Sequence, residues 1–440
     1  MESKLCMKRI SAWVLVFCLM AAVIVYSGPT SAKASGAEGM VEYYSMNAGG
    51  ERTALWLTQL VSDFEEETGI KVNLRFAGRD ILTKIRSRLV MGDPPDIIEQ
   101  DLSELSAALL GDEILATSLD DFFYNQQGPE GQDKFMDIFN ENLIRAYAKD
   151  ETLYFLPYGL FTSGFHYDVN LFEQFSLTPP KTMEEFYQVC DVLKENNIAP
   201  LAADGSINYY NAYYYYWACA RILGSGAFNN AAGDKTAAAW DDPGFLQAAQ
   251  LVYDLGEGGK DYFQKGYSGS VYPAAQGDWV QGMAGSILCG SWIPLETSNQ
   301  AKEGFQYGFY PFPTVEGGKG SETDCEIQLL GCAIPKNAKN IDNAKLFLNF
   351  MFRKDNVEKY AVNLMPIRKD VDSVLLHDIK EYINTSETFH ISYDGVMGEY
   401  PEWFANVFYS LDNELFFGSI TPEEFIKEIK EKSLEFWMNK

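Results

Sequence analysis

Strand-like and helix-like segments alternate near the start of the chain, and no other feature of the sequence constrains its fold as strongly. They follow one another in the order strand, helix, strand, helix, strand over residues 40–45, 51–68, 70–76, 80–91 and 96–98. The helical segments carry apolar residues at intervals of three and four, whereas 70–76 alternates apolar and polar residues. This order is typical of a parallel sheet with crossover helices, so an α/β fold is predicted.

The same mixed character continues to the C-terminus. We expect a further strand at 164–167, a loop or edge strand at 304–320, and helices at 183–196, 237–257, 341–354 and 421–440. A chain of 440 residues, 47% of them hydrophobic, can bury the cores of about two or three domains. More than one α/β lobe is therefore expected.

The first 34 residues are predicted to be a secretory signal peptide rather than part of the fold. Basic residues precede an uncharged run from residue 10 to 26, and Ala32-Lys33-Ala34 supplies the small residues of a cleavage site. Cleavage is expected after Ala34, which places the mature protein in the periplasm or outside the cell. The uncharged run is long for a signal core and short for a spanning helix, so retention as a membrane anchor stays open. A lipid anchor at Cys18 is not expected, because Phe17 stands where lipoprotein processing needs a small residue.

The charge balance excludes several classes of partner. The formal net charge is −27, from 62 acidic and 35 basic residues. Such an excess opposes binding to DNA, RNA and anionic membrane surfaces, since all of them are polyanions. Neither nucleic acid nor a membrane surface is an expected partner.

The cysteine and histidine content argues against a resident metal or redox centre. Beyond the signal segment, and without any C-x-x-C pair, lie Cys190, Cys219, Cys289, Cys325 and Cys332. An odd number leaves at least one thiol free, and a disulfide stays open, with Cys325 and Cys332 the nearest pair in sequence. The 3 histidines are too few for a zinc cluster. No cofactor and no metal are predicted.

No catalytic motif is complete. The segment Gly233-Asp234-Lys235-Thr236 approaches a phosphate loop, but Asp234 separates Gly from Lys and Phe228 replaces the first Gly. No G-x-S-x-G elbow, H-E-x-x-H helix or dinucleotide fingerprint occurs. A glycosidase carboxylate pair stays an open alternative among 62 acidic residues, although no acid is marked out by its neighbours. The protein is predicted not to be an enzyme.

A tyrosine-rich segment is the most informative local feature. Residues 208–217 read NYYNAYYYYW, and on a helix Tyr209, Tyr213 and Tyr216 share one face. A fully buried core favours Leu or Phe, because each buried tyrosine hydroxyl needs a hydrogen-bond partner. We therefore expect the aromatic wall of a wet cleft, with rings that stack on sugars. Core packing of individual rings, and a phenolate iron site, are the alternatives.

Five blocks resemble those of a known family and occur in the same order. They are FEEETGIKV (64–72), GDPPDII (92–98), FHYDVNLF (165–172) followed by PKTMEEF (180–186), QGMA (281–284) followed by GSW (290–292), and IPKNAKN (334–340) followed by AKLF (344–347). Together they resemble the family 1 extracellular solute-binding proteins of the maltose-binding-protein-like kind, which are the capture subunits of ABC importers. The similarity runs from about residue 40 to the C-terminus.

The resemblance implies a two-lobed periplasmic-binding-protein fold of type II, in which hinge bending closes the lobes around a ligand in the cleft. The chain is expected to cross between lobes near 157–161, 330–333 and 365–369. The N-lobe would then comprise 40–158 plus 331–366, and the C-lobe 159–330 plus 367–440.

The resemblance also implies a set of ligand-binding residues. In this family the loop after the first strand and the end of the third strand contribute from the N-lobe, and aromatic side chains contribute from the C-lobe. The expected ligand-binding residues are Asn47, Glu51, Arg52, Asp101, Tyr167, Tyr213, Tyr216, Trp217, Trp292 and Trp403.

By this resemblance the protein is a non-catalytic carrier. It is expected to act as a monomer that binds a carbohydrate, an oligosaccharide given the long aromatic surface, and delivers it to ABC transporter permease subunits. A solute-binding protein for a non-sugar ligand and a secreted carbohydrate-active enzyme are the alternatives. An anionic solute is disfavoured, because Arg52 is the only cation in the expected site.

The sequence departs from the family pattern at three points. Asp168 and Met183 stand where the family usually has Asn and Trp, and both are expected to be structural positions. The lipidation cysteine of many members is missing, which favours a soluble periplasmic or secreted protein.

Overall fold

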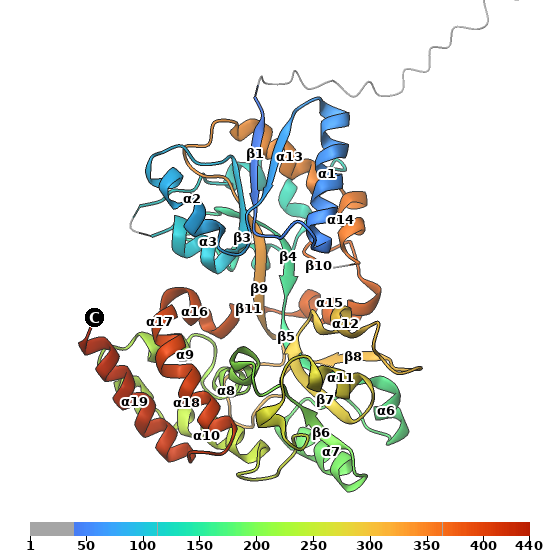
Figure 1. The fold of residues 1–440 in the computed structure, drawn as a ribbon, viewed down its shortest axis with the longest axis vertical. Helices are drawn as coiled ribbons and strands as arrows, with labels where there is room; N and C mark the ends of the chain where they lie inside the picture. The colour runs from blue at the N-terminus through green and yellow to red at the C-terminus, as the bar shows by residue number, and fades with distance from the viewer. Residues whose placement is uncertain (1–38, 112, 363) are drawn as a thin grey trace, which may run out of the picture. The chain divides into compact units, whose positions relative to one another are not determined.

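Two β-sheets organise the part of the chain that the computed structural model describes, residues 39–111, 113–362 and 364–440 (Figure 1). The predicted signal peptide lies outside these residues. The first sheet has seven strands, in the order β10 (Met365–Pro366), β4 (Phe155–Phe161), β9 (Asp324–Ala333), β3 (Ile97–Asp101), β1 (Val41–Ser45) and β2 (Val72–Phe76), with β11 (Thr388–Ile391) pairing to β9. The second has four, in the order β6 (Ala199–Ala202), β7 (Ala284–Gly290), β5 (Ser163–Asp168) and β8 (Tyr307–Tyr310).

The start of the first sheet is doubly wound. Strands β1 and β2 pair in parallel through α1 (Arg52–Thr68), and β1 and β3 pair in parallel with α2 (Ile81–Val90) on the connection. The connection from β1 to β2 and the connection from β2 back past β1 to β3 run in opposite directions across the sheet, so right-handed crossovers place α1 and α2 on opposite faces. The predicted parallel sheet is confirmed.

The remaining helices pack around the two sheets (Figure 1). Between β3 and β4 the chain forms α3 (Leu102–Leu109), α4 (Asp120–Tyr124), η1 (Phe135–Ile138) and α5 (Glu141–Arg145). Between β9 and β11 it forms α13 (Ile341–Met351), α14 (Lys354–Tyr360), η4 (Val374–Leu376) and α15 (His377–Thr385). Those between and after the strands of the second sheet are α6 (Val169–Gln174), α7 (Met183–Glu195), α8 (Asn208–Leu223), α9 (Ala227–Gly233), η2 (Ala238–Asp241), α10 (Pro243–Leu255), η3 (Tyr267–Gly269), α11 (Ala274–Val280) and α12 (Ile293–Thr297). The C-terminal part comprises η5 (Ser392–Gly395), α16 (Val396–Glu399), α17 (Pro401–Trp403), η6 (Phe404–Phe408), α18 (Tyr409–Phe416) and α19 (Pro422–Met438).

Local capping chemistry explains where several of these helices begin and end. Helix α1 ends at Gly69, whose φ of 77° is the left-handed conformation of a helix C-cap. Helix α19 begins with a capping box, in which Thr421 and Glu424 bond each other's backbone N–H groups. The expected helix at 237–257 is instead two pieces, η2 and α10, because Pro243 starts a new helix capped by Asp242.

Hydrophobic residues form two large cores and a small third one. The first core lies around the seven-stranded sheet, and the second surrounds α8 with the C-terminal helices. The third joins α11 to β7 through residues such as Trp279. Ile379 and Ile383 of α15 belong to the first core, although they follow the third expected crossing.

The three expected crossings lie on neighbouring strands. Residues 157–161 belong to β4, 330–333 to β9 and 365–366 to β10, and these three strands are adjacent in the first sheet. Strand β5, in the second sheet, begins only two residues after β4 ends. At this crossing the chain therefore passes between the two sheets through Thr162 alone, a connection too short to loop away.

Candidate functional site

The carboxyl ends of β1 and β3 mark the natural ligand position of the first sheet. Strand order reverses between these two strands, and in open α/β sheets ligands bind outside the carboxyl ends at such a reversal. Ser45 at the end of β1 is paired with Glu99 on β3, so the loops that follow both strands are neighbours. The loop after β1 carries Asn47 and Glu51, while Arg52 begins α1 and Asp101 ends β3.

An ion pair organises the exposed part of this edge. The guanidinium of Arg79 lies 2.9 Å from Glu51 Oε2 and also donates to the carbonyl oxygen of Met46 at 2.6 Å. Gln100 donates its amide to the carbonyl oxygen of Arg79 at 2.7 Å. Arg52, the first residue of α1, is exposed beside them. This edge therefore presents the charged side chains of Arg52 and Arg79 to solvent, while the buried amide of Gln100 holds the backbone of Arg79.

Asn47 points away from this surface. Only 4% of the residue is exposed, and its amide donates to Glu99 Oε1 at 2.7 Å and to Ser45 Oγ at 3.0 Å. The Glu99 carboxyl also accepts from Tyr43 and Tyr158, and burial raises its pKa above the ordinary value. The side chain of Asn47 thus supports the loop from beneath.

The carboxylate of Asp101, the last residue of β3, links the start of α3 to the neighbouring strand β9. Its Oδ1 accepts from the backbone N–H of Ser103 at 2.8 Å and so caps α3, while its Oδ2 accepts from the amide of Gln328 at 3.0 Å. Burial raises the pKa of Asp101, and these hydrogen bonds partly oppose that rise.

An aromatic wall, formed by Trp292 after β7 and by Tyr209 and Tyr210 of α8, adjoins Gln328. The ring of Trp292 is half-buried and lies 5.4 Å from Phe161 and 6.1 Å from Tyr210, centre to centre. Its Nε1 donates to the hydroxyl of Tyr210 at 3.3 Å. Tyr209, also half-buried, directs its hydroxyl to Gln328 Oε1 at 3.5 Å. The wall therefore offers flat ring surface with hydroxyl groups along it.

Gly290 determines where the Trp292 ring lies. A Cβ at position 290 would be 2.1 Å from ring atoms of Trp292, which no side chain tolerates. The ring lies over the bare Cα, and this close approach explains why the Gly-Ser-Trp block needs a glycine at position 290.

Five of the expected binding residues lie in the second core instead. Tyr213, Tyr216, Trp217 and Trp403 are at most 1% exposed, and Tyr167 is 8% exposed. These side chains satisfy their polar atoms or pack their rings internally. Tyr216 bonds His390, Trp217 bonds Ser163, Trp403 bonds Ser433, and the Tyr213 and Tyr167 rings pack on Tyr393 and Phe172. None of the five presents ring surface to a solute in this structure.

The position of α8 explains this difference. Every residue from 211 to 222 is buried, because α10, α18 and β7 surround the helix. Apart from Leu223 at its C-terminal end, only its first turn, with Tyr209 and Tyr210, is partly open. The 208–217 segment predicted a helix, which is α8, but helical periodicity alone does not tell which turn of a helix is exposed.

A cavity of about 400 Å³ lies next to Asp101. Ser103, whose N–H bonds Asp101, lines it together with Ser106 and Tyr147 on one side, and Asp394 and Glu399 line it on the other. None of the aromatic wall residues lines this cavity. Polar groups from both sides therefore surround a space large enough for a small polar solute.

Among the described residues, no group of three or more His, Cys, Asp or Glu side chains is arranged to hold a metal ion. Within the same ranges, no helix is both long and apolar enough to cross a membrane.

Comparison with known proteins defines the class. The bacterial extracellular solute-binding protein family matches residues 48–358, and the chain belongs to this family. The multiple sugar-binding protein of Streptococcus mutans is 22% identical over 355 residues, which cover 76% of this chain and 77% of that protein.

Solved structures agree on the fold. Apo RafE of Streptococcus pneumoniae has a TM-score of 0.71 at 20% identity, covering 92% of this chain and 100% of that one. RafE has also been solved in complex with raffinose, with a TM-score of 0.65 at 18% identity, covering 91% of this chain and 100% of that one. A sugar transporter protein of Bacillus licheniformis, in complex with stachyose, has a TM-score of 0.64 at 19% identity and covers 90% and 99%. The fold is thus the two-lobed one of solute-binding proteins, as predicted.

Proposed function

We propose that this protein is the extracytoplasmic capture subunit of an ABC importer and that its ligand is a neutral oligosaccharide. The observation that carries the proposal is the half-buried ring of Trp292, held over Gly290 and beside Tyr210, in contact with Phe161, the residue paired with Gln328. Rings stack on the apolar faces of sugars, while carboxylates, amides and hydroxyls bond the sugar rim. The relatives named for sugars support the same class of ligand.

The proposed contact surface combines the first sheet and its loops with aromatic residues of α8 and of the turn after β7. Glu51, Arg52, Asp101 and Trp292 come from the expected set. We add Gln328 and Tyr209 because Gln328 bonds both Asp101 and Tyr209, and Tyr210 because it accepts from Trp292. Asn47 contributes through its support of the loop.

Closure is proposed to occur about β4, β9 and β10. The lobes would be 40–158 plus 331–366 and 159–330 plus 367–440, with the ligand between them. The closed, loaded protein would dock on permease subunits as a monomer and release its ligand chemically unchanged.

A thermal-shift screen of the purified protein against mono- and oligosaccharides, including raffinose, stachyose and maltose, tests the proposal. A sugar at 100 times its Kd adds about 2.7 kcal/mol of stability, which gives a clear rise in Tm. Recovery of the intact sugar after incubation separates a carrier from a carbohydrate-active enzyme. Failure of every sugar to shift the Tm would overturn the proposal and direct the screen to non-sugar solutes.

A further inference from the structure

Gln328 occupies the point at which the two halves of the proposed site meet. It lies on β9, in register with Phe161 of β4. Its amide contacts Asp101 from the first sheet and Tyr209 from α8.

Asp101 determines which way the Gln328 amide points. The carboxylate accepts hydrogen bonds but does not donate them when ionised, so the nitrogen of the amide must face it, at 3.0 Å. Asp101 is itself held in place, because its other oxygen caps α3 through Ser103 at 2.8 Å. The amide oxygen Oε1 consequently faces Tyr209 and not Asp101.

This oxygen has hydrogen-bonding capacity to spare. An amide oxygen accepts two hydrogen bonds, whereas its one contact here, with the Tyr209 hydroxyl, is 3.5 Å long and at the outer limit of such bonds. Gln328 and Tyr209 are both only partly buried. A ligand hydroxyl can therefore donate to Oε1, while the Tyr209 hydroxyl turns to the same ligand.

We propose that Gln328 is a specificity-determining residue of this site, which selects among sugars by accepting a hydrogen bond from one ligand hydroxyl while Asp101 holds its amide in a single orientation. The inference rests on the proposed function. Ring stacking on Trp292 tolerates many sugars, since each has an apolar face. A fixed acceptor instead rejects a sugar whose hydroxyl points elsewhere, because the polar group is then left unpaired.

Titration calorimetry with raffinose, stachyose and maltose on the wild type and three variants tests this. Gln328→Met keeps the length of the side chain and removes both polar atoms. Asp101→Asn keeps a good helix cap and removes the charge that orients the amide. Gln250→Met is the matched control, because Gln250 is exposed on α10 and donates its amide to Asp254 at 2.8 Å.

We expect Gln328→Met to weaken binding of the preferred sugar by about tenfold and to weaken the others less, so that the Kd values converge. Asp101→Asn should likewise reduce the ratio of the Kd values between the other sugars and the preferred one. Gln250→Met should change neither the Kd values nor this ratio. The ratio is the decisive readout, since a purely structural role would weaken all three sugars equally.

The outcomes separate the two proposals. Wild-type protein that binds none of the three sugars counts against the proposed function and removes this inference with it. Wild-type binding with an unchanged Kd ratio in both Gln328→Met and Asp101→Asn overturns only the inference. If Gln328→Met fails to fold, as judged by its urea transition, the ratio of Kd values among the three sugars in Asp101→Asn decides whether the inference stands.

Discussion

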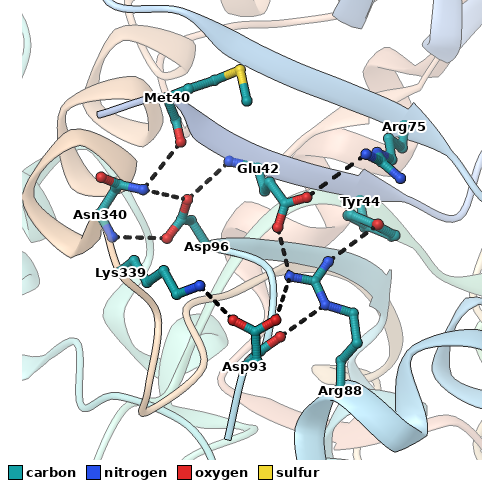
Figure 2. A network of polar contacts seen from close by, with 9 residues as sticks. All are labelled: Met40, Glu42, Tyr44, Arg75, Arg88, Asp93, Asp96, Lys339 and Asn340. Carbon is teal, nitrogen blue, oxygen red and sulfur yellow. Dashed lines mark hydrogen bonds and ion pairs between the residues drawn. The ribbon is translucent and has the colours of Figure 1, made fainter. Parts of the chain in front are cut away.

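The carboxylate of Asp96 accepts two hydrogen bonds from Asn340, 244 residues away in sequence. One comes from the backbone N–H at 2.8 Å and the other from the side-chain amide at 3.0 Å (Figure 2). The same carboxylate accepts from the backbone N–H of Glu42 at 2.9 Å. Asp96 thus joins β1, the start of β3 and the start of α13. Two of the blocks that mark the family, 92–98 and 334–340, are neighbours in space for this reason.

Asp96→Ala should lower the free energy of unfolding by about 3 kcal/mol, because three donors lose their acceptor in a buried setting. Urea denaturation measures it. Asp133→Ala, at an exposed position, serves as control and should cost less than about 0.5 kcal/mol. Equal effects of the two substitutions would contradict the role given to Asp96.

Trp292 and Trp403 should respond to substitution in opposite ways. Trp292→Ala is expected to weaken sugar binding by at least about tenfold with a modest loss of stability, since its ring is half-buried. Trp403→Ala should cost about 3–5 kcal/mol of stability, because this ring is fully buried. Calorimetric titration and urea denaturation of both variants give the comparison. Comparable Kd values for Trp292→Ala and wild type would remove the aromatic wall from the site.

Gly290→Ala tests the placement of the Trp292 ring while leaving the tryptophan side chain itself intact. The added methyl group would meet the Trp292 ring at 2.1 Å, so the ring must move. Sugar affinity should fall as in Trp292→Ala, and the tryptophan fluorescence of the ligand-free protein should change. Gly277→Ala is the control, because a Cβ there meets no atom within 4 Å, and it should leave sugar affinity unchanged.

Asp412 should make stability depend on pH. Neither of its carboxyl oxygens has a hydrogen-bond partner among the described residues, and burial raises its pKa well above the ordinary value. The unfolded carboxyl titrates near pH 4, at about 3.9. The stability contributed by the protonated form is complete below that pH and is lost as pH rises through the folded-state pKa.

Asp412→Asn should therefore have a higher Tm than wild type at pH 7.5, and the difference should disappear below about pH 4. Thermal unfolding across this pH range measures it, with Asp133→Asn as control. A Tm difference that is the same at both ends of the range would show that folding does not raise the pKa of Asp412.

The five cysteines after the signal segment should be free and protected. All are buried and none is paired. Cys325 and Cys332, the nearest pair in sequence, are seven positions apart on the extended strand β9, about 23 Å at 3.3 Å per residue, whereas a disulfide requires Cα atoms within about 7 Å. Burial raises the pKa of both thiols. Alkylation followed by mass spectrometry should label these five thiols only after denaturation, and label on Cys332 in the native state would contradict this.

The tyrosine helix separates what local pattern predicts from what packing decides. Helical spacing in 208–217 correctly indicated α8, because residues three and four apart share a face whatever surrounds the helix. The choice of Tyr213, Tyr216 and Trp217 as ligand contacts depended on which turn stays open. That depends on α10, α18 and β7, which are distant in sequence and bury residues 211–222. Gln328 was not selected because its strand carries no local sign of a site.

The α/β character, the caps of helices such as α1 and α19, and the family follow from residues near one another along the chain. Backbone conformation and amphipathic periodicity are local properties, and each of the five family blocks is a short local segment. The tertiary structure decided which polar groups meet. Asp101 reaches Gln328 only because β3 and β9 are adjacent strands, and Trp292 reaches Tyr210 only because the end of β7 approaches the first turn of α8. Such contacts join residues tens to hundreds of positions apart, and their geometry is set by packing that no local pattern encodes.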